Sequence, residues 1–313
     1  DIKRDGSSDI SAKRKKKRIS ILFGLKYYEQ QKNLSDNTIS TTKYNLFNFF
    51  PKALFYQFFK AANVYFLVVS ILTCLDFSPQ KPSSMLGTFG FVLLTNLIKE
   101  CYEDYNRHLQ DKVSNEKKSM KLDLNGKWIN IECSKLKAGD IIKVVKDEEI
   151  PADNIIISCS NSGGYCNIDT KNLDGETNLK EKNSLENFKH MSDFTNFYGK
   201  VECDSPNENL HDFEGLFNVD KIDKMKNEND KSIYLSIKNL LLKGTTLKNT
   251  EWSIGIVIYT GLNCKIMKNS KKTAPIKISK IRKTMNLLLY SLFIFTIIVC
   301  TIVACSPHIF CEC

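Results

Sequence analysis

The sequence contains few of the residues from which metal centres and disulfide frameworks are built. Its 313 residues include only 4 histidines, and the 11 cysteines are scattered, without a Cys-x-x-Cys pair or a His/Cys cluster at zinc-ligand spacing. The closest cysteines, Cys311 and Cys313, stand at the end of the chain. Because a chain of this length with 42% hydrophobic residues can form a core without cross-links, we expect reduced, structural thiols and no metal site.

Signals of processing and repetition are also missing. The chain begins at Asp1 without an initiating methionine or a signal peptide, and it stops soon after a hydrophobic run. We therefore expect a fragment of a longer protein. No internal repeat and no lipidation or retention signal is evident, so neither a repeat architecture nor a particular membrane is indicated.

Negative charge is scarce relative to positive charge. The 45 lysines and arginines exceed the 35 aspartates and glutamates, giving a formal charge of +10. Much of the excess lies in the run Lys13–Arg18 and in a Lys-rich stretch from 265 to 283, both next to hydrophobic segments. Surfaces that bind nucleic acid interleave basic and aromatic residues, so no nucleic-acid partner is expected. The charges suit cytoplasmic flanks of membrane helices or, for residues 1–18, a solvated tail.

Three long apolar stretches are present. Residues 53–75 contain one charge, Lys60; residues 85–101 follow a short linker with two prolines; residues 286–305 contain no charge. Since roughly 20 apolar residues cross a bilayer, we expect a transmembrane hairpin with helices at about 53–75 and 85–101, and a third transmembrane helix at 285–306. A buried helix of a soluble protein is the alternative for the first stretch.

The basic residues near these stretches indicate their orientation. Cytoplasmic loops of membrane proteins carry an excess of lysine and arginine. The hairpin turn offers only Lys81, whereas the other ends of the stretches carry Lys52, Lys99, Arg107, Lys280, Arg282 and Lys283. We therefore expect an integral, multi-pass membrane protein with its N-terminus and middle region in the cytosol.

The middle of the chain, residues 102–284, has a different pattern. Short β-branched runs alternate with turn signals such as Gly139-Asp140 and Gly163-Gly164, which predicts an all-β core. A polar stretch after residue 101 is expected to continue the second helix into the cytosol. The strand candidates are Ile141–Val145, Ile155–Ile157, Ile233–Ile237 and Ile254–Tyr259.

One block carries a family resemblance. Asn172–Lys180, with the sequence NLDGETNLK, resembles the actuator loop of the type-IV P-type ATPases, the phospholipid flippases. Ion pumps of the same superfamily carry Thr-Gly-Glu-Ser at this place, which disfavours an ion-transporting function. Further blocks that look like flippase sequence follow in order: NTISTTKY (Asn37–Tyr44), FFPKALFYQFFKAANVYFL (Phe49–Leu67), KECYEDYNRHLQD (Lys99–Asp111), AGDIIKVVKDEEIPAD (Ala138–Asp153), CDSPNENLHDFEG (Cys203–Gly215), LLKGTTLKNTEW (Leu241–Trp252) and YTGLNCKIMKN (Tyr259–Asn269).

The resemblance implies a fold of α-helical transmembrane segments plus an all-β, distorted jelly-roll actuator domain in the cytosol. The expected parts are a basic cytosolic tail (1–36), the transmembrane hairpin (37–101), the actuator domain with helical connections (102–284), the third transmembrane helix (285–306) and an exoplasmic end (307–313).

The resemblance also assigns the loop to hydrolysis of an aspartyl phosphate that lies on another domain. This step needs a water in line with the phosphoryl group and a carboxylate that orients it and accepts its proton. Glu176 is the expected carboxylate, and Gly175 would let the backbone approach the phosphate. The Thr177 hydroxyl could hold water or phosphate, while Asp174 shapes the turn. Taken alone, the tetrapeptide could be a simple polar turn.

A lipid pathway is implied by the same resemblance. Flippases move headgroups along a polar groove beside their first helices, which would account for the polar residues Gln57, Asn63 and Asn96 in apolar surroundings. Many aminophospholipid flippases carry paired glutamines at the exoplasmic end of the first helix. The corresponding positions here are Leu72 and Thr73, a departure that leaves phosphatidylserine specificity unsupported.

The remaining expectations concern what lies outside the chain. ATP and Mg2+ would be bound by downstream phosphorylation and nucleotide-binding domains, so this fragment alone should hydrolyse no ATP. A membrane phospholipid is the expected substrate and a two-helix accessory subunit is an expected partner. The alternative function is a regulatory flippase-like module fused to a guanylyl cyclase.

Overall fold

The computed structural model describes residues 18–31, 34–45, 47–75, 81–188, 194–221, 232–272 and 279–310. Most of the basic run before Arg18 and the last residues of the expected exoplasmic end lie outside this part of the chain. The chain divides into two compact units: residues 1–39 with 113–273, here the β unit, and residues 40–112 with 274–313, here the helical unit.

The β unit consists of three antiparallel sheets. A six-stranded sheet has the order β11-β5-β13-β4-β2-β3, a four-stranded sheet has the order β1-β8-β9-β10, and a three-stranded sheet has the order β12-β6-β7. The strands are β1 (Arg18–Phe23), β2 (Lys118–Leu122), β3 (Trp128–Glu132), β4 (Ile141–Val145), β5 (Asp153–Cys159), β6 (Tyr165–Asp169), β7 (Lys180–Asn183), β8 (Tyr198–Asp204), β9 (Glu214–Lys221), β10 (Ser232–Ser236), β11 (Leu240–Leu241), β12 (Thr246–Lys248) and β13 (Trp252–Tyr259). Short helices α1 (Tyr28–Gln31), α5 (Lys171–Asp174) and α6 (Lys265–Lys272) accompany them.

The strands β5 and β13 of the six-stranded sheet are buried on both faces, to which their successive side chains point in turn. In β5, Ile155 and Ile157 belong to a core cluster shared with the four-stranded sheet, which includes Phe23 and Phe217. Ile156 belongs to a second cluster, shared with β6 and β12 of the three-stranded sheet. Packing on both faces explains why every residue of β5 is buried, and the predicted all-β domain is confirmed.

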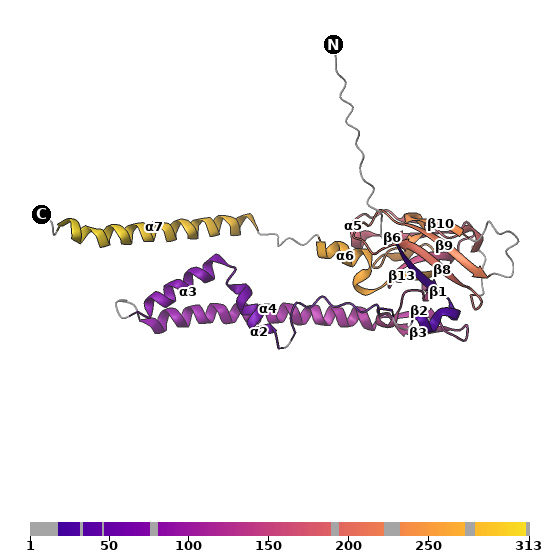
Figure 1. Cartoon of the computed structure of the whole chain (residues 1–313), viewed down its shortest axis with the longest axis horizontal. Coiled ribbons are helices and arrows are strands. Elements are labelled where there is room, and N and C mark those ends of the chain that lie inside the picture. Colours follow the sequence, from indigo (N-terminus) through magenta and orange to yellow (C-terminus); the bar gives the residue numbers. More distant parts are fainter. Residues whose placement is uncertain are drawn as a thin grey trace, which may run out of the picture. The chain divides into compact units, whose positions relative to one another are not determined.

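Part of the tail expected for residues 1–36 forms a strand of the β unit. Residues 18–23 form β1, which pairs antiparallel with β8 from Arg18 opposite Asp204 to Phe23 opposite Gly199 (Figure 1). Phe23 is fully buried and its ring stacks on that of Phe217 with centroids 5.0 Å apart. The alternating apolar residues of this segment therefore belong to a sheet, although the adjoining basic run favoured a tail.

The helical unit contains α2 (Phe49–Gln57), α3 (Ala61–Thr73), α4 (Pro82–Glu116) and α7 (Lys280–Phe310). Within the described residues, one helical segment, Lys283–Val303, is long and apolar enough to cross a membrane. Helices α2 and α3 are apolar enough to form a second span if the two are taken together, but the angle between them is 92°. The expected hairpin of two membrane helices is therefore not confirmed, and α4 combines the expected 85–101 helix with its polar continuation.

The expected helix 53–75 is broken at residues 58–60, where the backbone leaves the α-helical pattern. The amides of Phe58, Phe59 and Lys60 bond three residues back, and Lys60 adopts an extended conformation with ψ 121°. The Asn63 side chain donates a 2.8 Å hydrogen bond to the Gln57 carbonyl oxygen, which also accepts from the Lys60 amide at 3.2 Å. An asparagine near the start of α3 thus stabilises the bend.

Candidate functional site

The candidate site is the loop from Thr170 to Leu179, which connects β6 to β7 and contains α5 (Figure 1). The base of the loop is closed by the β6–β7 ladder, in which Ile168 lies opposite Lys180. Ile168 is buried, and Leu173 of α5 packs against the larger core cluster. The exposed residues between Leu173 and Lys180 are therefore fixed at both ends.

Asp174 organises the turn. Its Oδ1 accepts a 3.0 Å hydrogen bond from the Glu176 amide, and both carboxylate oxygens lie 3.1 Å from the Thr170 hydroxyl, which donates to them. Its Oδ2 accepts from the Lys180 ammonium at 2.5 Å. The Lys180 hydrogen bond, followed by that of the Glu176 amide, lowers the pKa of Asp174 to about 2, so this carboxylate stays ionised at neutral pH.

Gly175 gives the turn its direction. Its φ of +76° lies in the left-handed region, and its amide closes α5 by bonding to the Lys171 carbonyl at 3.0 Å. A Cβ added here would meet no atom within 4 Å, so the constraint is conformational and not steric crowding. A residue with a Cβ would require roughly 1–2 kcal/mol to adopt this conformation.

Glu176 and Thr177 extend from this turn and are exposed. The Glu176 side chain is 60% exposed, and its Oε2 lies 3.0 Å from the Lys180 ammonium. The hydrogen bond to Asp174, followed by that to Glu176, raises the pKa of Lys180. The structure thus brings Asp174, Gly175, Glu176 and Thr177 onto one turn, with a carboxylate accessible at its tip.

Two residues of this arrangement were missed from the sequence. Thr170 is buried and donates to Asp174, and Lys180 bridges two carboxylates although it stands inside the matching block. The spacing Glu176 to Lys180 would have been a usable signal only if the segment were helical, because i,i+4 pairs meet on helices. Here the bridge depends on the turn, and β7 supplies the lysine.

A buried aspartate at the start of β5 ties together three segments of the β unit. Asp153 is fully buried, and its carboxylate accepts backbone hydrogen bonds from Lys243 at 2.8 Å and Lys265 at 2.7 Å. Burial raises the pKa of Asp153 to about 6, against the opposing effect of these two amides. Because the Asp153 side chain is not accessible to a substrate, its role is structural.

Asn37 makes a second long-range tie. Its side-chain amide donates to the carbonyls of Cys133 and Pro151 at 2.9 and 3.0 Å, and its oxygen accepts from the Gly261 amide at 2.8 Å and the Lys243 ammonium at 3.1 Å. Every hydrogen-bonding position of this buried amide is used. The segment before residue 39 is therefore part of the β unit.

The expected lipid-pathway residues lie in the helical unit and are not all brought together. Gln57 and Asn63 meet at the α2–α3 break, and Thr73 is buried with its hydroxyl bonded to the Ser70 carbonyl at 2.8 Å. Leu72 is 48% exposed, and Asn96 bonds only to Val92 of its own helix among the described residues, at 3.0 Å.

Ser70 is a further buried polar residue of α3 that the sequence reasoning missed. Its hydroxyl and Oε1 of Gln57 have no hydrogen-bond partner within the described part of the chain. Unpaired buried oxygens are costly, and these two differ in this from the side chains of Asn63 and Thr73, which donate hydrogen bonds.

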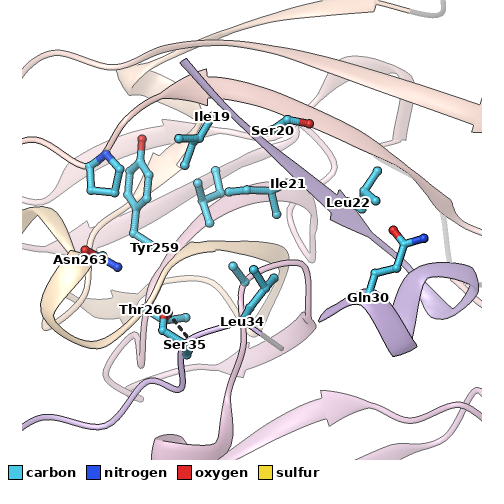
Figure 2. A pocket seen from close by; sticks show the side chains of 13 residues that line it. Ile19, Ser20, Ile21, Leu22, Gln30, Leu34, Ser35, Tyr259, Thr260 and Asn263 are labelled. Atoms are coloured by element: carbon cyan, nitrogen blue, oxygen red, sulfur yellow. Dashed lines mark hydrogen bonds between the residues drawn. The ribbon is translucent and has the colours of Figure 1, made fainter. Parts of the chain in front are cut away.

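A cavity of about 450 Å³ lies elsewhere in the β unit, between β1 and the end of β13 (Figure 2). Figure 2 shows apolar side chains such as Ile21 and Leu34 around it, with Ser35 and Thr260 at one end, where their hydroxyl oxygens are 3.5 Å apart. No residue of the Thr170–Leu179 loop lines it. Within the described residues no group of three or more His, Cys, Asp or Glu side chains could hold a metal ion.

Comparison with known families matches two regions of the chain. Residues 20–86 match the phospholipid-translocating ATPase N-terminal family, and residues 114–272 match the P-type ATPase actuator domain. The first match includes most of β1 and the helix break, and the second includes the candidate loop.

Individual relatives agree with the family matches. The chain is 40% identical over 261 residues to probable phospholipid-transporting ATPase 5 of Arabidopsis thaliana, covering 82% of this chain and 20% of that protein. It is 39% identical over 268 residues to phospholipid-transporting ATPase 10 of the same plant, covering 84% and 22%. The chain thus spans about a fifth of the length of these relatives, and they give no support to the guanylyl cyclase alternative. The chain belongs to the P-type ATPase family, with the N-terminal region and actuator domain of its phospholipid-translocating, type-IV branch.

Proposed function

We propose that this chain supplies the actuator domain and part of the lipid pathway of an ATP-driven phospholipid flippase. The observation that carries the proposal is the geometry of the loop. Glu176, an exposed carboxylate, extends from a turn that Asp174 holds through the Glu176 amide and the Thr170 hydroxyl. Such a turn can present a carboxylate to a phosphorylated residue on another domain without exposing the core beneath it.

The proposed reaction is hydrolysis of an aspartyl phosphate. Glu176 orients a water molecule and accepts its proton while the water oxygen forms a bond to phosphorus. The bond between phosphorus and the aspartyl oxygen breaks, its electron pair returns to the aspartate carboxylate, and inorganic phosphate leaves. Gly175 has no side chain to obstruct the phosphoryl group, and the exposed Thr177 hydroxyl can bond to the water or to a phosphoryl oxygen.

ATP and Mg2+ are cofactors that the ATPase relatives imply. The described residues do not suit a Mg2+ site, because no group of three acidic, His or Cys side chains is present among them. The carboxylates of the loop, moreover, are paired with Lys180. We therefore place both cofactors on the phosphorylation and nucleotide-binding domains, outside this chain.

The helical unit is proposed to lie in a membrane as part of a multi-pass protein whose N-terminus and β unit are cytosolic. The apolar segment Lys283–Val303 and the bent pair α2–α3 support this placement. The buried polar atoms of Gln57, Asn63 and Ser70 suit passage of a lipid headgroup. Leu72 and Thr73 replace the paired glutamines expected for aminophospholipids, so we assign no headgroup. A two-helix accessory subunit stays a prediction.

The test is Glu176→Gln in a full-length protein that contains this chain. We expect the phosphoenzyme to form normally from ATP and to accumulate, since the amide cannot accept the proton of the water. The exposed Glu181 of β7 provides a matched control, and Glu181→Gln should turn over like the wild type. Dephosphorylation of Glu176→Gln at the wild-type rate would contradict the proposed function.

A further inference from the structure

Lys180 takes no direct part in the proposed reaction, yet it contacts both acidic residues of the loop. Its ammonium lies 2.5 Å from Asp174 Oδ2 and 3.0 Å from Glu176 Oε2. We propose that Lys180 is a positioning residue of the dephosphorylation step: anchored on Asp174, it aims Glu176 and neutralises the acidic pair so that the loop can approach a phosphoryl group. The inference rests on the proposed function.

The charges of the loop make such a cation necessary. An aspartyl phosphate carries negative charge on its phosphoryl oxygens, and Glu176 must come close to it while ionised. Asp174 is ionised as well, because its pKa is lowered to about 2. Two carboxylates facing a phosphoryl group would repel it in a site from which water is partly excluded. Lys180 compensates one of these charges within the loop itself.

The two contacts of Lys180 differ, and the difference assigns their roles. Asp174 is held from two further sides, by the Glu176 amide and the Thr170 hydroxyl, and its side chain is 31% exposed. Glu176 is about twice as exposed, at 60%, and its carboxylate lies farther from the ammonium. Asp174 is thus the fixed partner, while Glu176 can move from Lys180 toward a water molecule.

The backbone places Lys180 where it can do this. Lys180 is the first residue of β7 and lies opposite Ile168 of β6, whose side chain is buried. The ammonium therefore has a fixed origin at the base of the loop, while the carboxylates extend from the turn. Exposed ion pairs contribute little to stability. Loss of the lysine should accordingly affect the reaction and not the folding.

The experiment compares Lys180→Met, Lys180→Arg and the double variant Asp174→Asn/Lys180→Met in a full-length protein that contains this chain. The phosphoenzyme is formed from ATP, and the rate of its decay is measured after ATP removal. Inhibition by orthovanadate, which mimics the phosphoryl group in its transition state, is the second readout. Lys248→Met is the control, because Lys248 is also an exposed lysine paired with an aspartate in the same three-stranded sheet.

We expect Lys180→Met to slow decay roughly tenfold to hundredfold, as a misplaced catalytic group does, and to weaken orthovanadate inhibition. Lys180→Arg keeps the positive charge, so it should retain most of the wild-type decay rate and most of the wild-type sensitivity to orthovanadate. The double variant should recover the part of the loss that comes from the uncompensated charge of Asp174, because an asparagine there is neutral and its side-chain oxygen can still accept the Glu176 amide. The melting temperatures of these variants should stay close to that of the wild type.

Two results would overturn the inference while leaving the function intact. The first is that the phosphoenzyme of Lys180→Met decays at the wild-type rate while Glu176→Gln still traps its phosphoenzyme. The second is a double variant as slow as Lys180→Met or slower, together with a lowered melting temperature, which would indicate a structural role. If Glu176→Gln itself decays normally, the proposed function fails and the inference fails with it.

Discussion

The carboxylate of Asp153 accepts a hydrogen bond from the backbone amide of Lys265, 2.7 Å away and 112 positions later in the sequence. Its other oxygen accepts from the Lys243 amide at 2.8 Å. One buried side chain thereby joins the start of β5, the turn after β11 and the first residue of α6. This tie fixes one edge of the six-stranded sheet to α6.

Asp153→Ala should destabilise the protein. It leaves two backbone N–H groups without their acceptor, at about 1–3 kcal/mol for each unsatisfied buried group, so a loss of about 2–6 kcal/mol is expected. Thermal unfolding of the purified protein measures this loss. The exposed Asp36, whose carboxylate lies 3.5 Å from the Lys137 ammonium, is the control: Asp36→Ala should change the melting temperature little.

The stability of the protein should depend on pH through Asp153. Burial raises its folded-state pKa from 3.8 to about 6. The folded protein therefore binds this proton more tightly than the unfolded chain, a contribution that is complete below about pH 4 and lost as pH rises through about 6. The shift corresponds to about 3 kcal/mol. The melting temperature of the wild type relative to Asp153→Asn should fall between pH 4 and 7 and then level off. Parallel curves would contradict the assignment.

Lys265→Met should loosen the segment from 205 to 213. The Lys265 side chain is fully buried, and its ammonium donates to Asn207 Oδ1 and to the carbonyls of Asn209 and Asp212, all within 2.8 Å. Loss of these charged hydrogen bonds should lower stability by about 2–4 kcal/mol. Hydrogen exchange should become faster in this segment first. Lys268→Met on the same helix should leave exchange there unchanged.

Substitutions at Gly175 should rank by their tolerance of a positive φ. Asparagine adopts the left-handed conformation more readily than alanine, and β-branched valine least readily. Phosphoenzyme decay should therefore slow in the order Asn, Ala, Val, since the strain displaces Glu176 from its turn. The melting temperature should fall by no more than the equivalent of about 1–2 kcal/mol. Equal decay rates in the three variants would show that the φ of +76° does not matter to the reaction.

Asn63→Leu should separate lipid transport from phosphorylation. It removes the 2.8 Å hydrogen bond to the Gln57 carbonyl at the α2–α3 break and replaces a buried polar side chain there by an apolar one. We expect phosphorylation by ATP to persist and lipid-stimulated turnover to fall at least severalfold. Lipid-dependent ATP hydrolysis measures the loss, with Thr95→Val as the control because the exposed Thr95 hydroxyl bonds within its own helix. Equal losses in both variants would argue against a pathway at the break.

Sequence reasoning worked where short-range pattern decides the structure. The β-branched runs that became β4, β5, β10 and β13 were predicted as strands, since alternation and turn signals act over a few residues. The apolar segment Lys283–Val303 was recognised because length and composition alone identify it. Asp174–Thr177 was located because its tetrapeptide lies within a longer matching block.

The sequence by itself therefore determined the all-β domain, the apolar C-terminal helix and the position of the loop. Only the tertiary structure decided that Arg18–Phe23 joins β8, that α2 and α3 are separated by a sharp bend, and that Lys180 bridges Asp174 and Glu176. Each of these depends on hydrogen bonds or ion pairs between groups whose approach is set by the fold. Local propensity carries no information about such partners, because the partners of β1 lie far away in the sequence and those of Lys180 are brought near by a turn at Gly175.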